Sequence, residues 1–147
     1  MKIGEVFVWR SFPDAKFPGE RKDRWFVYIG ETSALQLTVI ATIVTSTTQV
    51  QHYARGAARS NHAHVHIQKG QYGFEQDCVL DLDGGFYEYD RSALDGNQGI
   101  ESRGTATEDC LRRIFKAVLA SVHMPTRTKR DIHACLNQIG ITGLKRP

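Results

Sequence analysis

The stretch Arg24-Trp-Phe-Val-Tyr-Ile-Gly30 is a continuous apolar and aromatic run, and after a turn a β-branched run follows from Leu35 to Thr45. Short runs of this kind predict two consecutive buried strands. Further strands are predicted over 4–10, 63–68, 77–82 and 85–89. The last two are separated by Asp83-Gly-Gly85, a sequence typical of a hairpin turn.

Helical periodicity appears only in the last 40 residues. Thr105-Ala-Thr-Glu108 has the sequence of a capping box, and apolar residues at helical spacing follow it, which predicts a helix over 105–124. Pro125 ends this helix, and a second helix is expected over 126–140. These elements predict a single domain, 1–147, of mainly β (α+β) class. In it a small, highly curved β-barrel over 1–104 packs against two C-terminal helices.

The composition is that of one globular domain: 147 residues, 41% hydrophobic and 24% charged. No apolar run is long enough to span a bilayer and no secretory signal is recognisable, so a cytoplasmic protein without membrane contact is expected. Cys78, Cys110 and Cys135 lack metal-ligand spacing and are interpreted as reduced core residues. Residues 110–147 carry eight Lys and Arg against one acid, which either steers a charged partner or reflects solvated helices.

Two groups of residues raise the question of metal or acid–base chemistry. Three histidines alternate along one strand, at His62, His64 and His66. Same-face neighbours of a strand are nearly 7 Å apart, so these imidazoles converge poorly on one ion. The alternatives are a polar strand face, open to solvent or to a partner, and contact of the protonated rings with phosphates. Acids occur in two pairs, Asp81 with Asp83 and Glu88 with Asp90. Such pairs could divide acid and base roles or bind Mg²⁺, or they could serve turns and solubility. No metal and no cofactor is expected.

A phosphate site is the stronger candidate. If the strands at 24–30 and 35–45 pair antiparallel, the start of the first lies beside the end of the second, and Arg24 and Thr45 become neighbours. A guanidinium beside a hydroxyl suits a phosphate or a pentavalent phosphorane. The alternative is an ion pair of Arg24 with Glu20 or Asp23, with Thr45 as an ordinary strand residue.

The order of these motifs resembles the MazF/PemK (Kid-like) toxins of bacterial toxin–antitoxin systems. Gly4-Glu-Val-Phe-Val-Trp9 is similar to the family's opening strand, Gly-Asp-Ile-Val-Trp-Val. Arg24-Trp-Phe-Val-Tyr-Ile29 is similar to its Arg-Pro-Val-Leu-Val-Ile element, and Val39-Ile-Ala-Thr-Ile-Val-Thr-Ser46 to its Val-Val-Val-Pro-Val-Thr-Ser strand. Tyr89-Asp-Arg-Ser92 looks like Val-Asp-Lys-Ser. The collinear match covers roughly residues 3 to 122.

The resemblance implies an SH3-like barrel that forms a homodimer and is neutralised by a cognate antitoxin protein. It also implies a sequence-specific endoribonuclease that cuts single-stranded RNA without metal, with the ribose 2′-hydroxyl as nucleophile. Arg24 then takes the place of the catalytic arginine and Thr45 that of the catalytic threonine. The residues expected to contact substrate are Lys16, Glu20, Arg21, Ser46, Thr47 and Gln49. Candidate aromatics for stacking on RNA bases are Trp9, Trp25 and Tyr53, with core packing as the alternative for the two tryptophans.

Two departures from the family pattern leave other functions open. The family's proline after the arginine is Trp25 here, and the strand Asp-Gln-x-Arg-Thr-x-Asp appears as Gly84-Gly-Phe-Tyr-Glu-Tyr-Asp90, without its arginine. One alternative is therefore a non-catalytic SH3-like barrel that binds nucleic acid or a protein partner. Another is a metal-dependent enzyme that uses the histidine row and the acid pairs.

Overall fold

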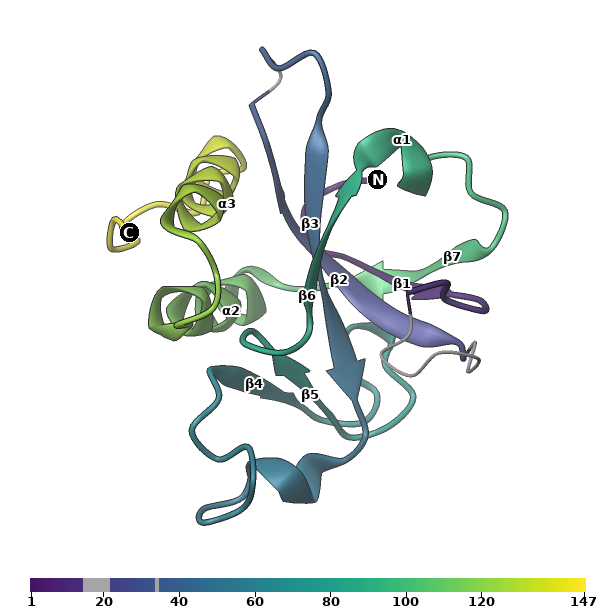
Figure 1. Ribbon diagram of the computed structural model, residues 1–147, viewed down its shortest axis with the longest axis vertical. Helices are drawn as coiled ribbons and strands as arrows, with labels where there is room; N and C mark the ends of the chain where they lie inside the picture. Colours follow the sequence, from purple (N-terminus) through teal and green to yellow (C-terminus); the bar gives the residue numbers. More distant parts are fainter. Residues whose placement is uncertain (15–21, 34) are drawn as a thin grey trace.

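The computed structural model describes residues 1–14, 22–33 and 35–147. It is an α+β fold in which one bent antiparallel sheet is flanked by helices (Figure 1). In the described part of the chain the strands are β1 (Glu5–Trp9), β2 (Arg24–Glu31), β3 (Ile40–Thr47), β4 (His64–Ile67), β5 (Cys78–Asp81), β6 (Phe86–Asp90) and β7 (Ile100–Thr105). The helices are α1 (Arg91–Leu94), α2 (Glu108–Ala120) and α3 (Thr126–Gln138), with short 3₁₀ turns η1 (Val50–Tyr53) and η2 (Gln71–Gly73).

The strand order is β4-β5-β3-β2-β1-β7, and β6 pairs with β3 beside β5. The predicted hairpin across Asp83-Gly-Gly85 is wrong, because β5 and β6 do not pair with each other. Both pair with β3, β6 along Ile40–Val44 and β5 at Ser46 and Thr47. The turn at residues 82–85 therefore connects two strands that pair with successive parts of β3. The sheet bends at this turn, beside the end of β3.

The predicted closed barrel is not formed, because β4 and β7 stand at opposite ends of the strand order. The free side of β7 is covered instead by η2. A Cβ atom at Gly104 would lie 2.2 Å from the backbone oxygen of Tyr72, and one at Gly73 would lie 2.3 Å from that of Arg103. This close approach of the two backbones is possible because both positions are glycine. It covers the edge of β7, which would otherwise be exposed.

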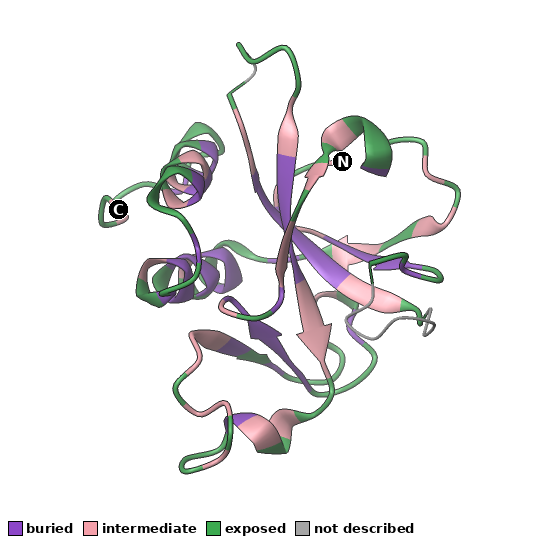
Figure 2. Cartoon of the chain, in the orientation of Figure 1, coloured by how far each residue is buried: buried purple, intermediate pink, exposed green. Residues whose placement is uncertain are grey.

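Buried residues line both faces of the sheet (Figure 2). On one face aromatic rings of β1, β2 and β6 pack together, with Phe7 and Phe26 stacked at 5.5 Å. The other face packs on α2 and α3, which lie side by side on one flank of the molecule (Figure 1). Ile132 of α3 lies directly over Gly30 of β2, where no side chain intervenes.

The two predicted C-terminal helices are present, with a corrected start for the first. Thr107, not Thr105, is its N-cap: the Thr107 hydroxyl accepts a hydrogen bond from the Cys110 amide at 3.3 Å. Thr105 still pairs with Glu5 in the sheet and cannot begin the helix. The predicted strand from residue 35 begins only at Ile40, because Leu35 and Leu37 are fully exposed in the connection. All three cysteines are free and buried, as expected.

Candidate functional site: a cationic cavity at the end of β3

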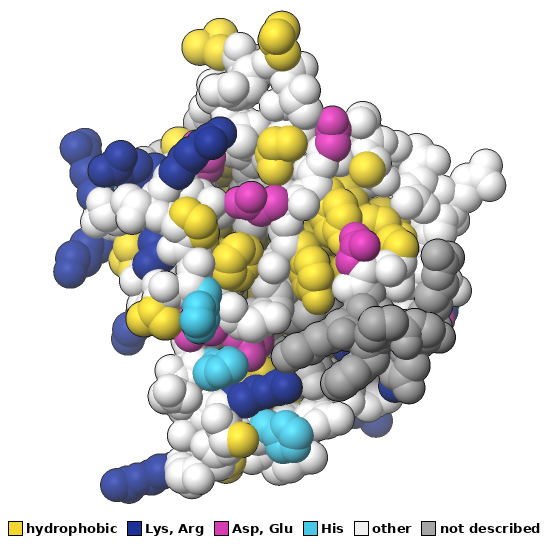
Figure 3. Space-filling model, in the orientation of Figure 1, with side chains coloured by type: hydrophobic (Ala, Val, Ile, Leu, Met, Phe, Trp, Pro, Cys, Tyr) yellow, Lys and Arg dark blue, Asp and Glu magenta, His cyan; other side chains and the backbone are white. Residues whose placement is uncertain are grey.

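A cavity of about 400 Å³ lies where β3 ends, between the start of β2, the η1 segment and the 81–85 turn. Figure 3 shows histidine and Lys/Arg side chains close together on the lower part of this face. The residues that line the cavity are Phe12, Arg24, Thr45, Ser46, Thr47, Gln49, His52, Tyr53, Arg59, His62, Asp81, Gly84, Gly85 and Tyr87. Gln49 and Gly84 are exposed, so the cavity opens to solvent.

Arg24 and Thr45 share this cavity because of the register of β2 and β3. Phe26 faces Thr45 across the pair, and Arg24, two residues before Phe26, projects on the same side of the sheet. The expected neighbours are thus brought together by the antiparallel pairing. The alternative ion pair with Asp23 is not formed: the Asp23 carboxylate accepts instead from Arg10, at 2.9 Å. In the described part of the chain no carboxylate pairs with Arg24.

The Thr45 hydroxyl has a partner already. It donates its single proton to the backbone oxygen of Trp25 at 3.0 Å, which leaves its lone pairs as acceptors. Phosphate oxygens need donors, so Thr45 must rotate away from Trp25 before it can bind one through its hydroxyl. Of the other residues expected to contact substrate, Ser46, Thr47 and Gln49 line the cavity. Lys16, Glu20 and Arg21 lie outside the described residues.

Three cavity residues that the predicted phosphate site did not include come from the connection between β3 and β4. Arg59, His52 and His62 all line the cavity, and the Arg59 amide donates to the His52 carbonyl at 2.8 Å, which folds this connection back on itself. A second guanidinium therefore stands in the same cavity as Arg24. His62 belongs to the alternating histidine row, but that pattern does not place it beside Arg24, because the path of the connection depends on contacts with β5.

Asp81 of β5 holds the side of the cavity formed by the β3–β4 connection and the 81–85 turn through hydrogen bonds. It is 5% exposed, and its Oδ1 accepts from the amides of Asp83 at 2.9 Å and Gly84 at 2.7 Å. Its Oδ2 accepts from the Tyr53 hydroxyl at 2.7 Å and lies 2.8 Å from Nδ1 of His62. Burial disfavours the carboxylate, but these hydrogen bonds outweigh it and hold the pKa of Asp81 below its usual value.

Tyr53 is therefore not a base-stacking residue. It is 4% exposed, and burial, followed by the hydrogen bond to Asp81, raises the pKa of Tyr53 to about 12. Of the other two candidate stacking residues, Trp9 is buried in the aromatic cluster. Trp25 is half-buried and lies beneath the Arg103 guanidinium, 5.4 Å from its ring centroid. The stacking surface expected from these three residues is thus largely absent from the cavity.

The three histidines of the row do not share one environment. His62 precedes β4 and enters the cavity, whereas His64 and His66 do not line it and contact each other with ring centroids 5.1 Å apart. Within residues 1–14, 22–33 and 35–147, no group of three or more His, Cys, Asp or Glu residues is arranged to hold a metal ion.

The acid pairs have separate structural contacts. Asp83 accepts from the Ala63 amide and from Ser121 after α2, at 2.8 and 2.7 Å, and Asp90 accepts from the Ser92 amide at the start of α1. Glu88 accepts from the Thr128 hydroxyl of α3 at 2.7 Å. These bonds connect the sheet to its helices and account for three of the four acids without invoking catalysis.

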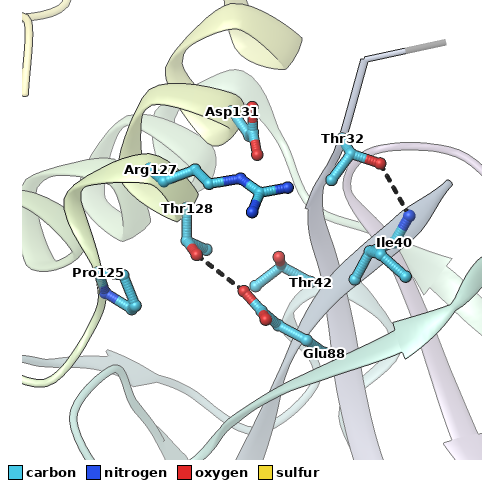
Figure 4. Close-up of a pocket in the computed structure, with 8 residues that line it drawn as sticks. All are labelled: Thr32, Ile40, Thr42, Glu88, Pro125, Arg127, Thr128 and Asp131. Carbon is cyan, nitrogen blue, oxygen red and sulfur yellow. Dashed lines mark hydrogen bonds between the residues drawn. The ribbon is translucent and has the colours of Figure 1, made fainter. Parts of the chain in front are cut away.

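A second cavity, of about 250 Å³, lies between β3, β6 and the first turn of α3 (Figure 4). Glu88, Arg127 and Asp131 line it together with Thr42, and Glu88 accepts a hydrogen bond from Thr128, which also lines the cavity. None of the described residues expected to contact substrate lines this cavity. We therefore treat the cavity around Arg24 as the candidate site.

No helix among the described residues has both the length and the apolar composition needed to cross a membrane. No protein-family model matches the chain, and no curated protein is significantly similar to it.

Proposed function

We propose that this chain is a metal-independent endoribonuclease of the MazF/PemK type. It would cleave single-stranded RNA in the cytoplasm as a homodimer and be neutralised by a cognate antitoxin. The observation that supports this best is the surroundings of Arg24: a guanidinium without a carboxylate partner among the described residues, beside the β3 hydroxyls, in an open cavity. The volume of about 400 Å³ lies in the range of roughly 300–1,000 Å³ typical of ligand sites.

The charge of the cavity favours a phosphodiester. Two guanidinium groups, of Arg24 and Arg59, line it against one carboxylate, that of Asp81. Asp81 directs its acceptors at protein donors, so its charge is offset locally. A phosphate that enters the cavity therefore meets two guanidiniums that no carboxylate of the described residues pairs with, and both can stabilise the extra negative charge of a pentavalent phosphorane.

Tyr87 occupies the position where the family strand carries its arginine. It lines the cavity near Arg24, and burial, opposed by the Arg24 charge, raises the pKa of Tyr87. The hydroxyl therefore keeps its proton at neutral pH and offers a hydrogen bond, but no charge, to a phosphate oxygen. The missing arginine is thus replaced by a neutral donor, while Arg59 supplies a second cation from another segment.

One observation favours the second candidate, a non-catalytic module that binds nucleic acid. Because the Thr45 proton is donated to the Trp25 carbonyl, the hydroxyl assigned to the reaction is not aimed at a substrate in this conformation. A binding module would use the same cations to hold RNA without cutting it.

The experiment is incubation of the purified protein with mixed-sequence RNA oligonucleotides in EDTA, followed by end-group analysis. Fragments ending in a 2′,3′-cyclic phosphate are expected, and Arg24→Ala should lower kcat by about 10²–10³-fold. The matched control is Arg130→Ala, which removes an exposed α3 arginine outside the cavity. Salt-sensitive binding without fragments would support the second candidate, and equal activity of Arg24→Ala and wild type would contradict the assigned role of Arg24.

A further inference from the structure

The hydrogen bond between His62 and Asp81 has the geometry of a catalytic acid–base pair. We infer that His62 is the general base of the proposed RNA cleavage and that Asp81 is its positioning residue. This inference rests on the proposed function, and it adds a proton acceptor that the Arg24 and Thr45 assignment lacks.

The orientation of His62 is set by the Asp81 carboxylate, which is itself held by other hydrogen bonds. Nδ1 of His62 lies 2.8 Å from Oδ2 of Asp81, and the side chains are 29% and 7% exposed respectively. Asp81 is held by the amides of Asp83 and Gly84 and by the Tyr53 hydroxyl. A base held by a fixed partner needs little reorganisation when a proton is transferred.

The same contact determines which ring nitrogen carries the proton. An ionised carboxylate only accepts hydrogen bonds, so the short contact to Asp81 requires the proton on Nδ1 of His62. Nε2, on the other edge of the ring, then carries a lone pair and has no hydrogen-bond partner among the described residues. Because His62 lines the cavity with Arg24 and Thr45, this lone pair is available to a substrate there.

The cleavage step also needs a proton donor for the leaving oxygen, and His52, a second histidine of the cavity, can supply that proton. Nε2 of His62 takes the proton of the ribose 2′-hydroxyl while O2′ bonds to phosphorus. The bond from phosphorus to O5′ then breaks, and O5′ takes a proton from the imidazolium of His52. Both histidines return to their starting states by exchanging protons with water.

Several charged or titratable groups line the cavity with His62 or contact it directly, and they contribute to the pH dependence. They are Asp81 of β5, Tyr53 and His52 of η1, Arg59 of the following loop, Arg24 of β2, Tyr87 of β6, and His64, whose Nδ1 lies 2.6 Å from the His62 carbonyl oxygen. Among the residues that the structure describes, no Lys or Arg forms an ion pair with Asp81, and His62 is the titratable base in contact with this carboxylate.

The test measures RNA cleavage by His62→Ala between pH 4.5 and 9. We expect kcat to fall by about 10²–10⁴-fold, the fall in activity toward acid pH to disappear, and imidazole added to the buffer to restore part of the rate. His66→Ala is the matched control, because this exposed histidine of the next strand lies outside the cavity. Imidazole rescue separates a catalytic role from a structural one, since a misfolded variant is not rescued.

Asp81→Asn tests the positioning role without emptying the site. Its Oδ1 still accepts from the Asp83 and Gly84 amides, but an NH₂ group replaces Oδ2 and donates to Nδ1 of His62, which moves the ring proton to Nε2. A large fall in kcat with little change in KM is expected. If His62→Ala keeps its rate and pH profile while Arg24→Ala is inactive, only this inference is overturned. If the wild type cleaves no RNA, the proposed function and this inference fall together.

Discussion

The attachment of α3 to the sheet depends on the absence of a side chain at Gly30. An alanine Cβ there would lie 2.6 Å from Cγ1 and 3.2 Å from Cα of Ile132, well inside normal contact distance. The clash should destabilise the protein by about 1–3 kcal/mol. Ile132 is 1% exposed, so Ile132→Ala alone should cost about 2–5 kcal/mol through the cavity that it leaves. In the Ile132→Ala background the clashing Cγ1 is gone and only the contacts with Cα at 3.2 Å and Cβ at 3.4 Å remain, so Gly30→Ala should cost clearly less there than in the wild type.

The assay is urea unfolding of the wild type, both single variants and the double variant, followed by tryptophan fluorescence. The structure predicts a favourable coupling of about 1–2 kcal/mol between the two sites, within the range found for residues in contact. Equal costs of Gly30→Ala in both backgrounds, within about 0.5 kcal/mol, would refute the packing of α3 on β2. A changed m-value would mean that the denatured state or the cooperativity had changed, and the cycle would then be repeated with Ile132→Val.

Two further predictions concern the cavity. Arg59→Ala should weaken binding of single-stranded RNA and reduce the slope of log K against log salt by about 0.7, as expected for one lost phosphate contact; fluorescence anisotropy at several salt concentrations measures both. Hydrogen bonds hold the pKa values of Asp81 and Asp83 below the ordinary 3.8 despite burial, so their contribution to stability is complete above about pH 4 and is lost as the pH falls toward the lowered values. Acid unfolding of Asp81→Asn should accordingly show a shallower pH dependence than that of the wild type.

The parts of the fold that could be predicted are those whose residues show their environment in a local pattern. β1 and β2 are apolar on both faces, and α2 has a clear helical stripe, so each lies close to its expected position. β7 was missed because its sequence, IESRGT, is polar and lacks alternation, and the strand is half-buried or exposed throughout. It is a strand because it pairs with β1, which is a tertiary contact that no local pattern records.

The same distinction applies to the candidate site. Arg24 and Thr45 could be placed together from the sequence, because antiparallel pairing of consecutive strands determines which ends meet. Arg59 could not be placed there, and His62 was predicted only as a member of the histidine row, because both lie in a connection whose path is set by hydrogen bonds to β5 and to the turn after it. This connection contributes five of the residues that line the cavity, against six from the strands, although its local sequence does not mark it as part of a binding site.

The basic C-terminal segment bears on the choice between a steering surface and ordinary solvated helices. Lys129 donates to the carbonyls of Leu119 and Ser121, where α2 ends, and so satisfies acceptors that the helix leaves open. Arg112 donates to the Thr142 carbonyl and fastens the C-terminal segment to α2. Part of the positive charge beyond residue 110 thus stabilises helix ends, and neither residue lines the cavity.

The positions of Arg59 and His62 in the candidate site depend on how their loop is attached to the sheet, since a loop has no regular backbone hydrogen bonds of its own to fix it. The loop reaches β5 and the turn after it at three points: Asp81 accepts from Tyr53 and bonds His62, the Asp83 carboxylate accepts from the Ala63 amide, and the Leu82 amide donates to the Ala63 carbonyl. Two of these three attachments are carboxylates. Protonating or replacing either one loosens the loop before it loosens the sheet, so the geometry of the cavity should be lost before the global fold. Because the general-base role of His62 by itself lowers activity in acid, the measurement is amide hydrogen exchange: the amides of the 49–63 loop should lose protection at a milder acidity than that which changes tryptophan fluorescence, and simultaneous losses would show that the loop is held by something else.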